Sequence, residues 1–125
     1  EVRFYNWASE GTTYIRADLD ATAVRTGQVD FYQREAVDGQ FIVSSGIELY
    51  TPDINVPFNI ASRHGSTFVN GAVDGVALTT STGPSVLADF SARNFDIGGK
   101  FMGNVGKVRV WAEDIEDAGI VEAST

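Results

Sequence analysis

The densest group of acidic side chains lies at positions 113–117, which read Glu-Asp-Ile-Glu-Asp. A retaining glycoside hydrolase needs two carboxyl groups about 5–5.5 Å apart, one as the nucleophile and one as the general acid. Alternate residues share one face of a strand, so a row of three carboxylates needs acidic residues at 113, 115 and 117. Ile115 interrupts that row, and the local sequence favours the start of a helix. We therefore assign no catalytic carboxylate.

His64 is the only histidine of the chain and follows Ser62 and Arg63. A serine hydrolase built around it would lack the Gly-x-Ser-x-Gly nucleophile elbow, which the sequence does not contain. We therefore interpret His64 as a turn residue whose ring faces solvent. With neither type of site assigned, we expect the chain not to be an enzyme.

Aspartates suited to calcium are scattered along the chain. Ca²⁺ takes six to eight oxygen ligands, usually with two or more carboxylates among them. Asp18 and Asp20 stand two apart, whereas Asp89 and Asp96 come much later, and none belongs to a compact Asp-x-Asp-x-Asp loop. We assign no metal ligand and expect no cofactor. A calcium site assembled from distant loops stays an open alternative.

Two alternating runs, 12–19 and 28–35, place aromatic and charged side chains on one face of a sheet. The outward set consists of Tyr14, Arg16, Asp18, Asp30, Tyr32 and Arg34. Aromatic rings offer an apolar surface to sugar rings, and charged side chains hydrogen-bond hydroxyl groups. Tyr14, Arg16, Tyr32 and Arg34 are therefore candidate ligand-binding residues on an exposed face. The alternatives are a solvated face stabilised by cross-strand pairs, and a face that packs on a neighbouring subunit.

Trp7 follows Phe4 and Tyr5 in what we expect to be a loop ahead of the first strand. It is a further candidate for ligand stacking, with an end cap over the sandwich or a docking residue for the next domain as alternatives. Trp111 closes an alternating run in which Lys107 and Arg109 lie on its side. We expect Trp111 to have a structural role.

Pairs of turn-forming residues recur at short intervals and separate runs rich in Val, Ile, Thr, Phe and Tyr. This pattern is typical of an antiparallel sandwich or barrel. The predicted strands lie near 12–19, 28–35, 40–45, 46–51, 56–63, 66–70, 73–79, 92–98 and 101–111. A short helix is predicted around 114–123, with Asp114 as its N-cap.

Asn70-Gly71 is the strongest turn signal, because a two-residue type I′ turn needs φ > 0 at both central positions. It predicts a hairpin with Phe68 and Val73 on its two strands. The glycine-led run 103–111 and the acidic turn 112–118 follow later. In this order, the segments resemble the laminin-G-like, concanavalin A-like lectin/glucanase superfamily, and most of all the copies found in bacteriophage tail fibres and tailspikes. The likeness is tightest over 55–118, and 5–15 adds to it.

The resemblance implies one concanavalin A-like domain over 1–125: an all-β, two-sheet antiparallel jelly-roll sandwich with one short C-terminal helix. It also implies that Trp111 packs where the last strand meets that helix. Glycan-cleaving members carry Glu-x-Asp-x-Glu on a strand, a pattern that Ile115 breaks here. Many members bind calcium. Because the chain begins with Glu1 rather than Met, we expect a domain cut from a longer polypeptide or a processed chain.

The resemblance further implies a non-catalytic recognition or structural module on an outward-facing, otherwise extracellular, bacteriophage virion protein. Its expected partner is a bacterial surface glycan. The first alternative is a purely structural decoration or subunit-interaction domain, with neighbouring virion subunits as partners and homo-oligomerisation through the parent protein. The second alternative is a glycoside hydrolase-like enzyme.

Composition narrows the classes of partner. The 125 residues include 17 acidic and 9 basic ones, for a formal net charge of −8. Such a surface repels nucleic acid and anionic membranes, so neither is an expected partner. No apolar run approaches the roughly 18 residues that would predict membrane insertion. The chain has no cysteine, which excludes disulfides and zinc sites built from thiolates.

Overall fold

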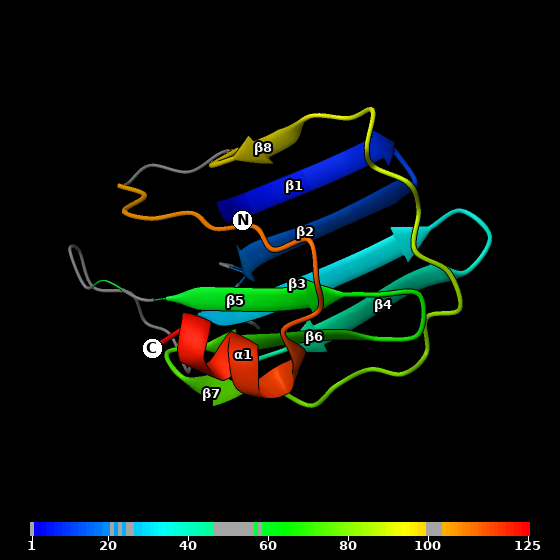
Figure 1. The fold of residues 1–125 in the computed structure, drawn as a ribbon. Helices are drawn as coiled ribbons and strands as arrows, with labels where there is room; N and C mark the ends of the chain where they lie inside the picture. Colours follow the sequence, from blue (N-terminus) through cyan, green and yellow to red (C-terminus); the bar gives the residue numbers. More distant parts are fainter. Residues whose placement is uncertain are drawn as a thin grey trace.

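The computed structural model describes residues 2–20, 22, 24, 27–46, 57, 59–99 and 104–125. In these residues the chain forms eight strands and one helix, arranged as two antiparallel sheets in two layers (Figure 1). The mostly β architecture with one short C-terminal helix is as predicted. The predicted strand 46–51 lies outside the described residues, apart from Gly46.

The larger sheet has the order β4-β3-β2-β1-β8. Its strands are β1 (Val2–Glu10), β2 (Thr13–Asp20), β3 (Gln28–Glu35), β4 (Gly39–Ser44) and β8 (Phe95–Ile97). The first four follow one another along the chain as antiparallel neighbours, so Ala17 lies opposite Tyr5 on one side and Phe31 on the other. The predicted strand 28–35 is confirmed with its bounds, and the predicted strand 40–45 is confirmed one residue earlier. Strand β8 covers only the second half of the predicted strand 92–98.

Strand β1 corrects the prediction that Trp7 lies in a loop. The register between β1 and β2 shifts between Arg3 and Tyr5 and again between Ala8 and Glu10. Such irregularities insert a residue and break the alternation that marks a strand in a sequence. Phe4 and Tyr5 consequently both pack against the core, although they are neighbours in the chain.

The smaller sheet contains β5 (Ile60–His64), β6 (Val69–Val73) and β7 (Val76–Ala77). Its two-residue turn is Asp74-Gly75, with φ angles of 45° and 80°, so the prediction of a turn at Asn70-Gly71 is wrong. Asn70 and Gly71 lie within β6 and are buried. A Cβ atom at Gly71 would overlap the ring of Phe31. Gly71 is therefore required for packing between the sheets and not for turn formation.

Helix α1 (Glu116–Ala123) confirms the predicted C-terminal helix and packs on the smaller sheet, as Figure 1 shows. Ile120, a residue of α1, is fully buried. The N-cap is Ile115 rather than the predicted Asp114. Asp114 still contributes at this end, because its Oδ1 accepts a hydrogen bond of 2.9 Å from the backbone N–H of Glu116.

The core lies between the sheets where β6 packs on β3 and β4. It consists of Ala17, Leu19, Val29, Phe31, Val43, Val69 and Val73. The smaller sheet covers only part of the larger one. In Figure 1 the segment 104–115, drawn in orange, instead crosses in front of the β1 side of the larger sheet. The residues 104–111 form no strand, so the predicted strand 101–111 is wrong for the part that the structure describes.

Candidate functional site

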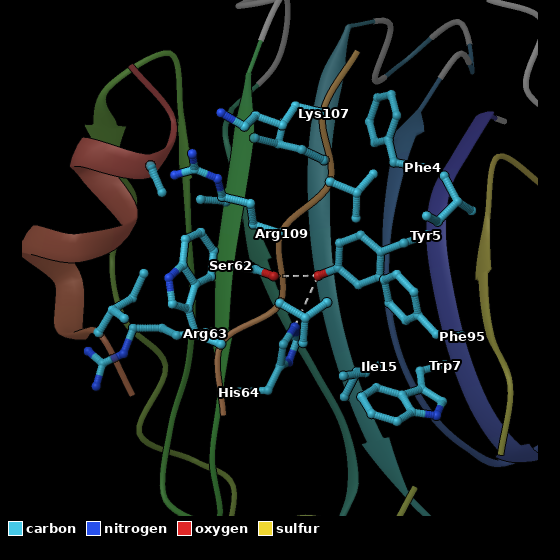
Figure 2. Close-up of a pocket in the computed structure, with 18 of the residues that line it drawn as sticks. Phe4, Tyr5, Trp7, Ile15, Ser62, Arg63, His64, Phe95, Lys107 and Arg109 are labelled. Carbon is cyan, nitrogen blue, oxygen red and sulfur yellow. Dashed lines mark hydrogen bonds between the residues drawn. The ribbon is translucent and has the colours of Figure 1, made fainter. Parts of the chain in front are cut away.

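A groove of about 1820 Å³ separates β1 and β8 from the edge strand β5 (Figure 2). The floor is the inner face of β1 and β8, one wall is β5, and the segment 104–113 runs along the opening. The groove exists because the larger sheet is five strands wide and the smaller one only three within the described residues. Concave surfaces of this kind are where proteins usually bind ligands.

Aromatic rings form most of the floor. The pairing of β1 with β8 places Tyr5 opposite Ile97 and Trp7 opposite Phe95. The Phe95 ring stacks on Tyr5 with centroids 5.7 Å apart and meets Trp7 edge-on, also at 5.7 Å. Trp7 is held by Phe90, at 5.6 Å, and donates a hydrogen bond of 3.1 Å from Nε1 to the carbonyl of Arg93. The sequence-predicted candidate Trp7 therefore lines the groove, but from a strand.

A chain of polar groups connects the floor to the wall. The Tyr5 hydroxyl lies 2.5 Å from Ser62 Oγ and 3.0 Å from His64 Nε2, as the dashed lines in Figure 2 show. Gln33 donates from Nε2 to the carbonyl of Gly65 at 2.8 Å, which turns its Oε1 toward His64 Nδ1 at 3.3 Å. Since Oε1 only accepts, Nδ1 carries the imidazole proton. Nε2 then accepts from Tyr5, which in turn accepts from Ser62.

The two titratable groups of this network are neutral at pH 7. Burial raises the pKa of Tyr5 far above its ordinary value of 10, and burial lowers the pKa of His64 to about 4. His64 lies in strand β5 with hydrogen bonds at both ring nitrogens, so the prediction of a solvent-facing turn histidine is wrong. The group in contact with the Ser62 hydroxyl is the Tyr5 phenol and not the imidazole, so His64 does not take a proton directly from the serine.

Arg63 joins the wall of the groove to helix α1. Its guanidinium donates to both carboxylate oxygens of Asp114, at 2.9 and 2.5 Å, and to Asp117 Oδ1 at 2.8 Å. Asp117 also accepts from Asn70 at 2.9 Å and from Thr80 at 3.1 Å. These bonds hold the pKa values of both carboxyl groups below their usual range, with Arg63 the main cause for Asp114 and Asn70 for Asp117. The acidic cluster thus anchors the helix.

The four candidates of the outer sheet face lie together, as the alternation predicts, but away from the groove. The Arg16 guanidinium stacks between the rings of Tyr14 and Tyr32, 4.6 and 4.5 Å from their centroids. Only 7% of Tyr14 and 8% of Tyr32 is exposed, so the expectation of exposed tyrosine rings is wrong. Arg34 lies opposite Tyr14. Burial is the main cause that raises the pKa of Tyr32 to about 12.

The side chains along the opening are exposed. Trp111 is 45% exposed and lines the groove. The last strand from which it was expected to pack on the helix is not formed in the described residues 104–111. Lys107 and Arg109 make no hydrogen bond or ion pair to any residue that the structure describes. Figure 2 shows both on the segment that runs beside β5.

Sequence reasoning missed most of this site. Tyr5, Ser62 and Phe95 come from three separate segments, and no short motif connects them. Gln33 did carry a signal, because it follows Val29 and Phe31 on the core-facing side of β3 and is only 3% exposed. A polar side chain at such a position indicates a buried hydrogen-bond partner.

No group of three or more His, Asp or Glu residues within the described ranges has a geometry that could hold a metal ion. Of the aspartates considered for calcium, Asp18 forms ion pairs with Arg3 at 3.2 Å and Arg16 at 2.9 Å. Asp89 accepts a hydrogen bond from the backbone of Ser91. Among the same described residues, no helix is both long and apolar enough to cross a membrane.

Comparison of the chain with models of protein families, with curated proteins and with solved structures finds no match.

Proposed function

We propose that the chain is a non-catalytic recognition module of a bacteriophage virion protein, which binds host-surface glycan in the groove between its two sheets. The row of aromatic rings on the groove floor is the observation that carries this proposal. The two-sheet architecture supports a concanavalin A-like jelly roll, and the resemblance of the segments 5–15 and 55–118 supports the virion origin.

The groove offers the two kinds of contact that a sugar needs. The rings of Tyr5, Trp7 and Phe95 provide an apolar surface for the C–H face of a pyranose. Lys107 and Arg109 along the opening are donors without a partner among the described residues, and hydroxyl and carboxylate oxygens are suitable acceptors. A preformed apolar floor with a few polar groups at its edge is the usual design of a small-molecule site.

Binding rather than cleavage is favoured by the state of the acidic groups near the groove. Glycoside hydrolysis needs one carboxyl group that keeps its proton near neutral pH. Within the described residues, four acidic side chains line the groove: Asp89, Glu113, Asp114 and Glu122. For two of them, Asp89 and Asp114, hydrogen bonds from Ser91 and from Arg63, respectively, lower the pKa. Both are therefore acceptors at pH 7. We expect a reversible complex without a covalent step.

Intrinsic fluorescence is a suitable test, because both tryptophans of the chain line the groove. Titration with a set of purified bacterial surface polysaccharides is expected to change the tryptophan emission with at least one polysaccharide. Arg109→Ala should weaken the binding of that polysaccharide roughly tenfold, as expected for the loss of a charged hydrogen bond. The matched control Arg34→Ala, on the outer face of β3, should bind like the wild type.

Three results would count against the proposal. The reverse pattern, with Arg34→Ala weakened and Arg109→Ala unchanged, would move the site to the outer face. Equal weakening in both variants would indicate non-specific attraction of an anionic polymer. Unchanged fluorescence at millimolar sugar with every polysaccharide would remove glycan binding altogether.

A structural role between virion subunits is the second candidate, and the rim of the groove favours it. Large apolar residues that are 37–67% exposed surround the opening; they are Leu87, Ile97, Val105, Val108, Val110 and Trp111. Exposed apolar patches of this kind mark protein contacts in soluble proteins. Sedimentation velocity over a range of concentrations separates the two roles, since a stable oligomer would favour the structural one.

A further inference from the structure

The segment 104–111 has the sequence of a β-strand but lies unpaired. Val108 and Val110 alternate with Lys107, Arg109 and Trp111, and Val110 is 67% exposed. No hydrogen bond connects its backbone to any described residue. Segments whose backbone is not held by hydrogen bonds are usually among the least stable parts of a fold.

The neighbouring strand β5 has a free hydrogen-bonding edge. Asp74 donates to the carbonyl of Asn59, and Gly65 donates to that of Phe68, so the odd-numbered residues of β5 bond to β6. Hydrogen-bonded and non-hydrogen-bonded pairs alternate along an antiparallel ladder. The backbone N–H and C=O groups of Ile60, Ser62 and His64 therefore point away from β6, and in the described residues they have no partner.

The unpaired segment and the free edge line the same groove. A strand added to β5 on this side would extend the smaller sheet over the aromatic floor on β1 and β8. Its alternate side chains would point toward that floor. With Val108 and Val110 turned inward, Lys107, Arg109 and Trp111 would lie on the outer side, the side on which Arg63 holds α1.

We propose that the free edge of β5 is a strand-docking site and that the segment 104–111 is its occupant. The segment then has two states: the unpaired one that the structure shows, called open, and a closed one in which it pairs with β5 and places alternate side chains on the floor. Arg63 keeps the segment close to its site by holding Asp114 just after it. Docking does not depend on any ligand. Its consequence for binding rests on the proposed function, since a glycan on the floor would exclude the docked segment.

Residue-resolved hydrogen exchange of the full chain tests docking directly. If the closed state is populated, every second amide of 104–111 should exchange at least about tenfold more slowly than in an unstructured peptide. The amides of Ile60, Ser62 and His64 should be slowed by the same factor. Unprotected rates at all of these amides would overturn the proposal.

Two proline variants show whether such protection comes from pairing. Val105→Pro and Val108→Pro each remove one N–H. Since successive N–H groups of a strand alternate in direction, one of these two would point at β5 in the docked state. Neither substitution removes a hydrogen bond seen in the open structure, so both variants should fold. At least one should abolish the protection of Ser62. Persistence of that protection in both variants would show that something other than this segment covers the edge.

The same measurements with saturating polysaccharide keep the two proposals apart. Ligand is expected to raise exchange in 104–111, and the docking-deficient proline variant should bind at least about threefold more tightly, because no closed state competes. Protection without any polysaccharide binding would overturn the proposed function and leave docking intact. Binding that changes neither exchange nor affinity in the variant would overturn the regulatory consequence.

Discussion

The hydroxyl of Tyr5 lies 2.5 Å from the hydroxyl of Ser62, although 57 residues separate them in the sequence. This bond connects β1 of the larger sheet to β5 of the smaller one, beside the groove. The bond is partly buried, and an unsatisfied polar group is costly there. The sheets are therefore joined by a specific polar contact as well as by apolar packing.

Tyr5→Phe is expected to lower the free energy of unfolding by about 1–3 kcal/mol, because Ser62 and His64 Nε2 lose their partner while staying in place. Urea denaturation of the single variants Tyr5→Phe and Ser62→Ala and of the double variant measures the coupling. A double-variant effect equal to the sum of the single effects would show that the bond contributes nothing.

Stability should rise with pH between about 4 and 6.5 because of His64. Its pKa is lowered to about 4 in the folded state, against 6.5 in the unfolded chain, so in this window the unfolded chain binds the extra proton. The full effect is at most ~3 kcal/mol. Asp114 and Asp117, whose pKa values are lowered, lose their contribution only at more acidic pH. Urea midpoints measured across this window should lose most of the slope in His64→Gln, and an unchanged slope would assign it to other groups.

Arg63→Ala should destabilise the fold by about 1–2 kcal/mol and loosen helix α1, since the helix loses its bonds to β5. The estimate is moderate because both aspartates are partly exposed. Arg63→Lys should recover little, since an ammonium group cannot bind a carboxylate in bidentate fashion. Amide exchange of Ile120 reports on the helix, and wild-type protection of Ile120 in Arg63→Ala would contradict this role.

Gly71→Ala should cost about 1–3 kcal/mol, because the new methyl group overlaps the Phe31 ring between the sheets. Gly11→Ala is the matched control, as a Cβ atom there would meet nothing within 4 Å. In the Phe31→Leu background, which lacks the ring, Gly71→Ala should lower the free energy of unfolding by less than it does in the wild type. Equal thermal midpoints for Gly71→Ala and Gly11→Ala would rule out the steric explanation.

Regular alternation made part of the fold predictable. Strand β3 was predicted with its observed bounds because Val29 and Phe31 alternate with polar residues and no bulge interrupts them. Strand β1 was missed because two register shifts disturb that alternation. The turn was predicted at Asn70-Gly71 because the local sequence does not show whether a glycine is needed for a turn or for close packing. Only the position of Phe31 in space distinguishes them.

The candidate site was less predictable than the fold. Trp7 was identified from its type alone, whereas Tyr5, Ser62 and Phe95 meet only through the pairing of distant strands. On the outer face of the larger sheet, the grouping of residues was predicted correctly but their burial was not. Alternation correctly placed Tyr14, Arg16 and Tyr32 together, but it carries no information on burial, and the two rings already use their faces to hold the guanidinium.

The order of strands in the larger sheet has a kinetic consequence. Strands β1–β4 pair with their immediate neighbours along the chain, whereas β8 joins β1 from about ninety residues away and α1 packs last in sequence. Contacts between near neighbours lose less chain entropy when they form. We therefore expect β1–β4 to be assembled in the folding transition state and β8 to dock afterwards. Conservative substitutions at Val29 should slow refolding, whereas those at Phe95 should mainly accelerate unfolding.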